Sequence, residues 1–69
     1  MLGIVSNDAW TWSSAARKAM ALSECNPEFW VDVAVDERDV YAVIVGAKEA
    51  ELVAAGFSRV MTFFGGKRV

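Results

Sequence analysis

The side chains of this sequence that are most suited to metal binding or acid–base chemistry are four carboxylates. They stand close together in the middle of the chain: Asp32, Asp36, Glu37 and Asp39. Oxygen ligands of this kind can bind Mg²⁺ or Ca²⁺, but their spacing matches no known calcium-binding loop. The sequence has no histidine and only one cysteine, Cys25, so it lacks the ligands of a structural zinc site. We therefore expect neither a metal nor a cofactor.

Nucleophilic groups are present without the partners that would activate them. Ser13 and Ser14 lie near Arg17 and Lys18, but no G-x-S-x-G turn surrounds them and the sequence offers no imidazole as a base. Gly46 stands alone before a predicted helix, whereas a phosphate-binding loop needs several glycines there. These gaps predict a protein that binds without catalysing a reaction.

Large apolar side chains are abundant for a chain of 69 residues: hydrophobic residues make up 55%, with three Trp, four Phe and one Tyr. A domain of this size buries only about 60% of the surface that its unfolded chain exposes. Some rings should therefore lie at the surface, where Trp and Tyr serve as contact residues in interfaces. A formal net charge of −2 argues against a nucleic-acid partner, which normally meets a basic surface.

The first half of the chain predicts a short strand and then a helix. Residues 1–6 have the apolar, β-branched character of a strand, and residues 6–8 offer three possible N-caps. A helix is expected from Asp8 to about Glu24, and the pair Asn26-Pro27 should end it. At helical spacing, the face turned to the core would hold Trp12, Ala15, Ala16, Ala19, Leu22 and Ser23.

Two strands, residues 28–35 and 40–45, are expected to form a hairpin around the charged loop 36–39. With Val35 opposite Val40, one face of the hairpin would hold Phe29, Val31, Val33, Val35, Val40, Ala42 and Ile44. The other face would collect Trp30, Asp32, Ala34, Tyr41, Val43 and Val45.

A second helix is expected over residues 47–55, with Ala47, Ala50, Val53 and Ala54 on its inner side. Gly56 would end it in the left-handed conformation, with Leu52 and Phe57 as the apolar pair of a Schellman motif. Residues 57–64 read as the last strand.

Together these elements predict an α+β fold of one small domain over residues 1–64, followed by a flexible C-terminal tail, residues 65–69. The order is βαββαβ, as in ferredoxin-like proteins, or αββαβ if the first strand does not form. In either case we expect two helices packed on one face of a three- or four-stranded antiparallel sheet.

Trp10 is a candidate contact residue, because helical projection places it with Arg17 on the polar stripe opposite Trp12. An exposed Trp beside an Arg is typical of a binding hot spot. The alternative is that Trp10 folds back over a neighbouring element and belongs to the core.

The second sheet face, with Trp30, Asp32 and Tyr41, is another candidate contact surface. Depending on its register, the last strand would add either Arg59, Met61 and Phe63 or Val60 and Phe64 to this face. An open aromatic face can stack RNA bases, but Asp32 and the acidic balance of the chain would repel phosphates. A protein partner or a second copy of the chain would cover the same face without that repulsion. Alternatively, the two faces are inverted and these residues form the core.

The acidic loop offers a third candidate. Asp36, Glu37 and Asp39 could dock into a basic groove of a protein partner. Alternatively, these charges only keep an exposed turn solvated.

The short, acidic chain is expected to be a small inhibitor or adaptor whose protein partner has a basic surface. Phage-encoded antagonists of host or defence machinery, anti-CRISPR proteins among them, share this compact build, which is an analogy of size and charge and not of sequence. A self-assembling subunit, such as a homodimer, and a small nucleic-acid-binding module are the alternatives.

The apolar start of the chain lacks the basic residues of a signal peptide, and no apolar run is long enough to cross a bilayer. A single thiol suits a reducing compartment. We therefore expect a cytoplasmic protein without a membrane partner.

Overall fold

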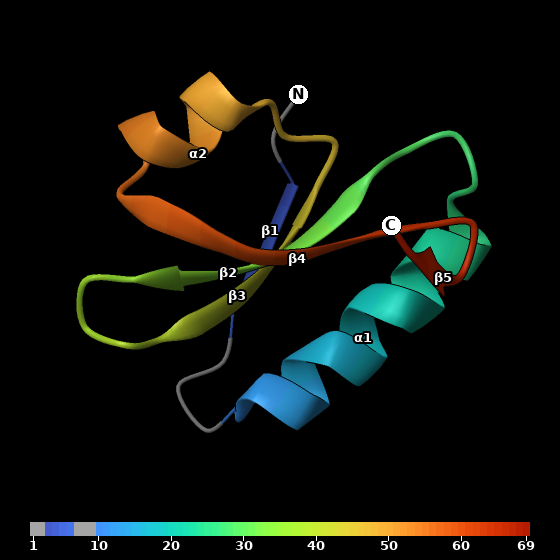
Figure 1. The fold of residues 1–69 in the computed structure, drawn as a ribbon, viewed down its shortest axis with the longest axis horizontal. Helices are drawn as coiled ribbons and strands as arrows, with labels where there is room; N and C mark the ends of the chain where they lie inside the picture. Colours follow the sequence, from blue (N-terminus) through green and yellow to red (C-terminus); the bar gives the residue numbers. More distant parts are fainter. Residues whose placement is uncertain (1–2, 7–9) are drawn as a thin grey trace.

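One antiparallel sheet organises the residues that the computed structural model describes, 3–6 and 10–69 (Figure 1). Its five strands are hydrogen-bonded in the order β1-β3-β2-β4-β5. The strands are β1 (Gly3–Ser6), β2 (Val31–Asp36), β3 (Tyr41–Val45), β4 (Phe57–Phe64) and β5 (Lys67–Arg68). Two helices, α1 (Trp12–Cys25) and α2 (Glu49–Ala54), pack on this sheet. The predicted α+β class is therefore confirmed, with one strand more than expected.

The two helices lie on opposite faces of the sheet (Figure 1). Under α1 the core consists of Ala15, Ala19, Val31, Val33, Val43, Met61 and Phe63. The alternate strand positions join α2 in a second cluster, formed by Ala34, Ala42, Ile44, Ala47 and Leu52. Since neighbouring side chains of a strand point to opposite faces, both faces of β2 and β3 are apolar and both need a cover. The expectation that both helices share one face is therefore wrong.

The order of elements along the chain agrees with βαββαβ through residue 64. In space, β1 lies at the sheet edge against β3, and β4 pairs with β2. With a fifth strand and a helix on each face, the ferredoxin-like arrangement is not confirmed.

Helix α1 begins later than the sequence predicted. Its N-cap is Thr11, whose side chain accepts from the backbone N–H of Ser14 while the hydroxyl of Ser14 accepts from the N–H of Thr11. Of the caps expected at residues 6–8, positions 7 and 8 lie outside the described residues. The later start leaves Trp10 before the cap, where it packs against the core under α1, whereas Trp12 begins the helix with an exposed side chain. The roles predicted for these two rings are therefore exchanged.

The β2–β3 hairpin is confirmed, but its predicted register is wrong by one residue. Val35 lies opposite Tyr41 instead of Val40. The cause is Asp39, whose φ of 60° places it in the left-handed region, where Asp is tolerated better than most residues. Asp39 donates its N–H to the carbonyl of Asp36, and Asp36 donates its own N–H to the carbonyl of Val40. A three-residue loop closed by a left-handed residue results, in place of the expected four-residue loop.

This one-residue shift changes which side chains share a face. Tyr41 lies with Val35 on the α1 side and packs against that core. Trp30 and Asp32, which the predicted register joined to Tyr41, belong to the opposite face.

A β-bulge interrupts the pairing of β2 with β4. Val33 lies opposite Met61 and Ala34 opposite Arg59, so Val60 is the extra residue. In a regular strand the side chains of Arg59 and Met61 would both point to the same face of the sheet. The bulge instead turns Arg59 to the face of Ala34, while Met61 stays in the core under α1.

The C-terminal end of α2 follows the predicted capping chemistry. Gly56 has a φ of 82° and donates its N–H to the carbonyl of Val53, as the C′ residue of a Schellman motif does. Phe57 packs against the cluster that contains Leu52, which completes the apolar pair. Of the predicted inner side, Ala47 is buried in the same cluster as Leu52, whereas Ala50, Val53 and Ala54 are exposed and were assigned wrongly.

The last residues are part of the sheet. Gly65 and Gly66, with φ of 61° and 82°, form the two-residue turn between β4 and β5 that requires a positive φ at both positions. The N–H of Gly66 donates to the hydroxyl of buried Ser23 on α1 at 2.8 Å, and the N–H of Val69 donates to the carbonyl of Thr62 at 2.9 Å. The segment expected as a tail beyond the fold therefore makes a hairpin with β4 and a hydrogen bond to α1.

Candidate functional site

The sheet face opposite α1 exposes a pair of aromatic rings. Trp30, just before β2, is 48% exposed and Phe64, at the end of β4, is 39% exposed. Their ring centroids lie 4.6 Å apart with the planes tilted by 41°, a favourable arrangement for an aromatic pair. Two large rings are thus held in fixed positions at the surface.

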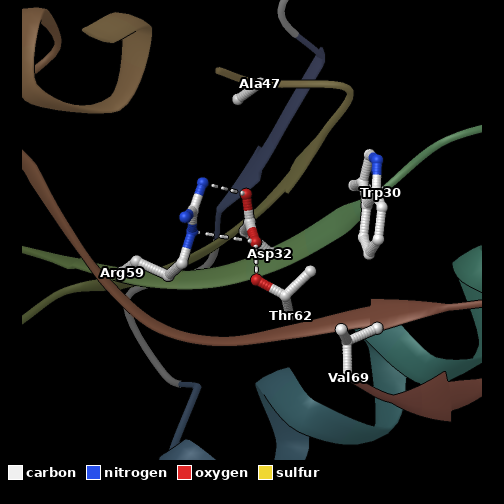
Figure 2. Close-up of a pocket in the computed structure, with 6 residues that line it drawn as sticks. All are labelled: Trp30, Asp32, Ala47, Arg59, Thr62 and Val69. Atoms are coloured by element: carbon white, nitrogen blue, oxygen red, sulfur yellow. Dashed lines mark hydrogen bonds and ion pairs between the residues drawn. The ribbon is translucent and has the colours of Figure 1, made fainter. Parts of the chain in front are cut away.

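A pocket of about 370 Å³ opens beside this pair, lined by Trp30, Asp32, Ala47, Arg59, Thr62 and Val69. Figure 2 shows the indole of Trp30 on one side and the guanidinium of Arg59 on the other, with Asp32 between them. The lining comes from the residue before β2, from β2 and β4, from the segment before α2 and from the residue after β5, so segments far apart in the sequence build it together.

Asp32 is the polar centre of the pocket, and its side chain is only 1% exposed. Its Oδ1 lies 3.2 Å from Nε of Arg59, and its Oδ2 accepts from Nη2 of Arg59 at 3.4 Å. The hydroxyl of Thr62 also donates to Oδ1 (Figure 2). A buried carboxylate requires this kind of pairing, because an unpaired charge in the interior is strongly unfavourable.

Arg59 connects the pocket to the first turn of α2. Its Nη1 lies 2.8 Å from Oε2 of Glu49, whose side chain is 70% exposed, while the Arg59 side chain itself is 36% exposed. The guanidinium is therefore shared between a buried and a surface carboxylate. The network combines rigid polar geometry with an exposed aromatic wall, which suits recognition of another molecule.

Two of the residues predicted as contact residues, Trp30 and Asp32, do lie together in this pocket. Tyr41 and Trp10 lie on the α1 side, partly buried against the core. For Trp10, this placement agrees with the alternative interpretation as a core residue. Arg17 is exposed on α1, away from the sheet face that carries the pocket.

The acidic loop makes its own internal contacts. The carboxylate of Asp36 accepts from the N–H groups of Arg38 at 2.8 Å and Val40 at 3.0 Å, and pairs with the Arg38 guanidinium at 3.1 Å. The hydrogen bond from Val40 and the contacts with Arg38 lower the pKa of Asp36, against the opposing effect of desolvation. The carboxylate of Asp36 therefore stabilises the turn through contacts within the loop, whereas the side chains of Glu37 and Asp39 are exposed.

Sequence reasoning placed Arg59 on this face in one of two possible registers, but it identified neither Arg59 nor Thr62 as a partner of Asp32. Their spacing of three residues would put them on opposite faces of a regular strand, and only the bulge at Val60 brings both to the face of Asp32. One signal was present: a charged residue within the otherwise apolar strand around Asp32 needs a partner from a neighbouring strand.

Comparison of the chain with known protein families, with curated proteins and with solved structures gave no match. Neither helix within the described residues has the length and apolar character needed to cross a membrane. Those residues also contain no group of three or more histidine, cysteine or acidic side chains placed to hold a metal ion.

Proposed function

We propose that this chain is a non-catalytic protein-binding module of the inhibitor or adaptor type. Its contact surface is the Trp30 patch, which we define as Trp30, Phe64 and Val69 together with the adjoining pocket. The observation that carries the proposal is the exposed Trp30–Phe64 pair on the sheet face opposite α1.

The energetics of interfaces favour this surface. Aromatic residues, Trp above all, dominate binding hot spots because they bury a large area at a small cost in conformational entropy. Trp30 and Phe64 already contact each other, so little further ordering is needed when a partner covers them.

The charge of the chain favours a protein partner with a basic surface. The formal net charge is −2, and the pocket beside Trp30 contains the carboxylate of Asp32 with Glu49 close by. Opposite charge on a partner would speed the encounter, whereas nucleic-acid phosphates would be repelled. The exposed free thiol of Cys25 suits a reducing, cytoplasmic compartment.

A second candidate function, assembly with further copies of the chain, is favoured by β1. This strand lies at the sheet edge, contains no charged residue, and exposes Ile4 and Val5. Natural edge strands usually carry charges or prolines that prevent pairing with another chain. Light scattering over a range of protein concentrations tests it, since assembly through β1 predicts a mass that rises with concentration.

Site-specific cross-linking tests the proposed contact surface. A photoreactive benzoylphenylalanine at position 64 replaces one exposed aromatic ring by another and should capture a protein from a lysate of the organism that encodes the chain. The matched control carries the same group at position 12, because Trp12 is also exposed (46%) but lies on α1, across the sheet.

Capture of the same protein from both positions, or capture that survives W30A in the position-64 variant, would refute the proposal. An adduct with twice the mass of the chain would instead support self-assembly.

A further inference from the structure

The ion-pair network beside Trp30 carries an excess of negative charge. Asp32 and Arg59 of this network line the pocket, and Glu49 lies outside its lining. Asp32 and Glu49 both pair with the single guanidinium of Arg59. Two carboxylates around one cation leave a formal charge of −1, at a site where Asp32 is shielded from water. An incoming anion would have to displace Glu49 and would still face Asp32, whereas a cation would balance the charge.

Asp32 also keeps hydrogen-bonding capacity. A carboxylate offers about four acceptor positions. Within the described residues, Oδ1 forms an ion pair with Nε of Arg59 and accepts a hydrogen bond from Thr62, while Oδ2 accepts a hydrogen bond only from Nη2 of Arg59. In Figure 2 this second oxygen points toward the side of Ala47, which is another lining residue of the pocket.

The walls of the pocket suit an aliphatic stem that ends in a cation. Trp30 presents an aromatic ring, and aromatic faces attract cations, Arg more often than Lys. Ala47 and Val69 add apolar surface for methylene groups. The volume, about 370 Å³, lies near the lower end of the range of ligand sites and leaves room for one long side chain.

We propose that this pocket receives an arginine side chain of the protein partner, with its guanidinium between the ring of Trp30 and the carboxylate of Asp32, while Glu49, which lies outside the pocket lining, adds negative charge nearby. The planar guanidinium can stack on an indole and donate directed hydrogen bonds at the same time, which a lysine ammonium does less well. This inference rests on the proposed function and specifies the residue that the Trp30 patch recognises.

A titration with two matched peptides tests the inference. The probes are acetyl-Ala-Arg-Ala-amide and the same peptide with citrulline, which has nearly the same shape without the charge. The indole N–H resonance of Trp30 is followed by NMR and assigned with W30F. We expect a saturable shift with the arginine peptide and at least a fivefold weaker effect with the citrulline peptide.

Two variants separate charge near the pocket from overall charge. E49Q removes the excess negative charge at an exposed position and should weaken binding of the arginine peptide by about two- to fivefold, the range of an exposed ion pair. E37Q makes the same change in net charge on the exposed β2–β3 loop and should leave binding unchanged within experimental error. W30L, which removes the aromatic face, should weaken binding by about two- to fivefold.

Equal binding of both peptides, no saturable shift up to about 20 mM, or an equal effect of E49Q and E37Q would overturn the inference. A shift produced by sodium phosphate instead of the arginine peptide would assign an anion to the pocket and also overturn it. A Trp30 resonance that moves with protein concentration alone would place a second copy there.

The two proposals can fail separately. Cross-linking at position 64 without arginine binding would leave the protein-binding module standing and remove only its arginine specificity. Arginine binding without cross-linking at position 64 would remove the protein-binding proposal.

Discussion

Replacement of Arg59 by leucine is the sharpest test of the polar network in the pocket. R59L leaves the buried carboxylate of Asp32 with Thr62 as its remaining partner among the described residues. Removal of one member of a fully buried ion pair typically costs 3–5 kcal/mol. Because the Arg59 side chain is 36% exposed, water can replace part of the lost interaction, and we expect a loss of about 2–3 kcal/mol.

That loss is large for so small a protein. A chain of 69 residues has a free energy of unfolding of roughly 3–10 kcal/mol, and a loss of about 2–3 kcal/mol lowers the melting temperature by roughly 8–20 °C. Urea denaturation at pH 7, followed by circular dichroism and Trp fluorescence, measures the change. R38L is the matched control: Arg38 also pairs with an aspartate, but its side chain is exposed at the β2–β3 loop, so a much smaller effect is expected.

The double variant D32N/R59L distinguishes an unpaired charge from lost packing. If the carboxylate without its cation is the cause, removal of that charge should recover at least about 1 kcal/mol relative to R59L alone. A double variant no more stable than R59L, or an R59L protein within about 0.5 kcal/mol of the wild type, would refute the reasoning.

Two further predictions concern the hairpin and the tryptophans. Because hydrogen bonds from Val40 and contacts with Arg38 lower the folded-state pKa of Asp36, its stabilising effect is present above the ordinary aspartate pKa of about 4 and is lost as the pH falls through the lowered value. Urea midpoints should therefore show D36N less stable than the wild type at pH 7, with the difference shrinking as the pH falls below about 4, and a difference that stays constant into acid would contradict this assignment. W10A should lower the free energy of unfolding by about 2–3 kcal/mol because Trp10 packs against the core under α1, whereas exposed Trp12 should tolerate W12A at a cost below about 1 kcal/mol. Equal costs for the two variants would disprove the exchange of roles seen in the structure.

Most elements were predictable because their signals are local. Alternating apolar residues indicated β2 and β3, and the stop at Asn26 and the C-terminal cap at Gly56 depend on chain conformations that involve only a few neighbouring residues. The abundance of large rings likewise predicted that some of them, Trp30 among them, would lie at the surface.

The faces of the sheet were not predictable with the same certainty. The left-handed conformation of Asp39 shortens the loop by one residue, and a shift of one residue exchanges every side chain between the two faces. The sequence allowed both loop lengths, so Tyr41 was assigned to the wrong side of the sheet. In α1, an N-cap at Thr11, three residues later than the last expected cap, Asp8, likewise changed the positions of both Trp10 and Trp12.

Sequence by itself therefore determined the α+β class, the central hairpin, the end of each helix and the surplus of apolar bulk, since propensity, capping and period-two alternation act over short stretches of chain. Only the tertiary structure decided that α1 and α2 take opposite faces, and that Asp32 meets Arg59 and Thr62 beside Trp30. Those contacts join segments far apart in the chain, and they depend on a strand register and a bulge that several neighbouring strands must settle together.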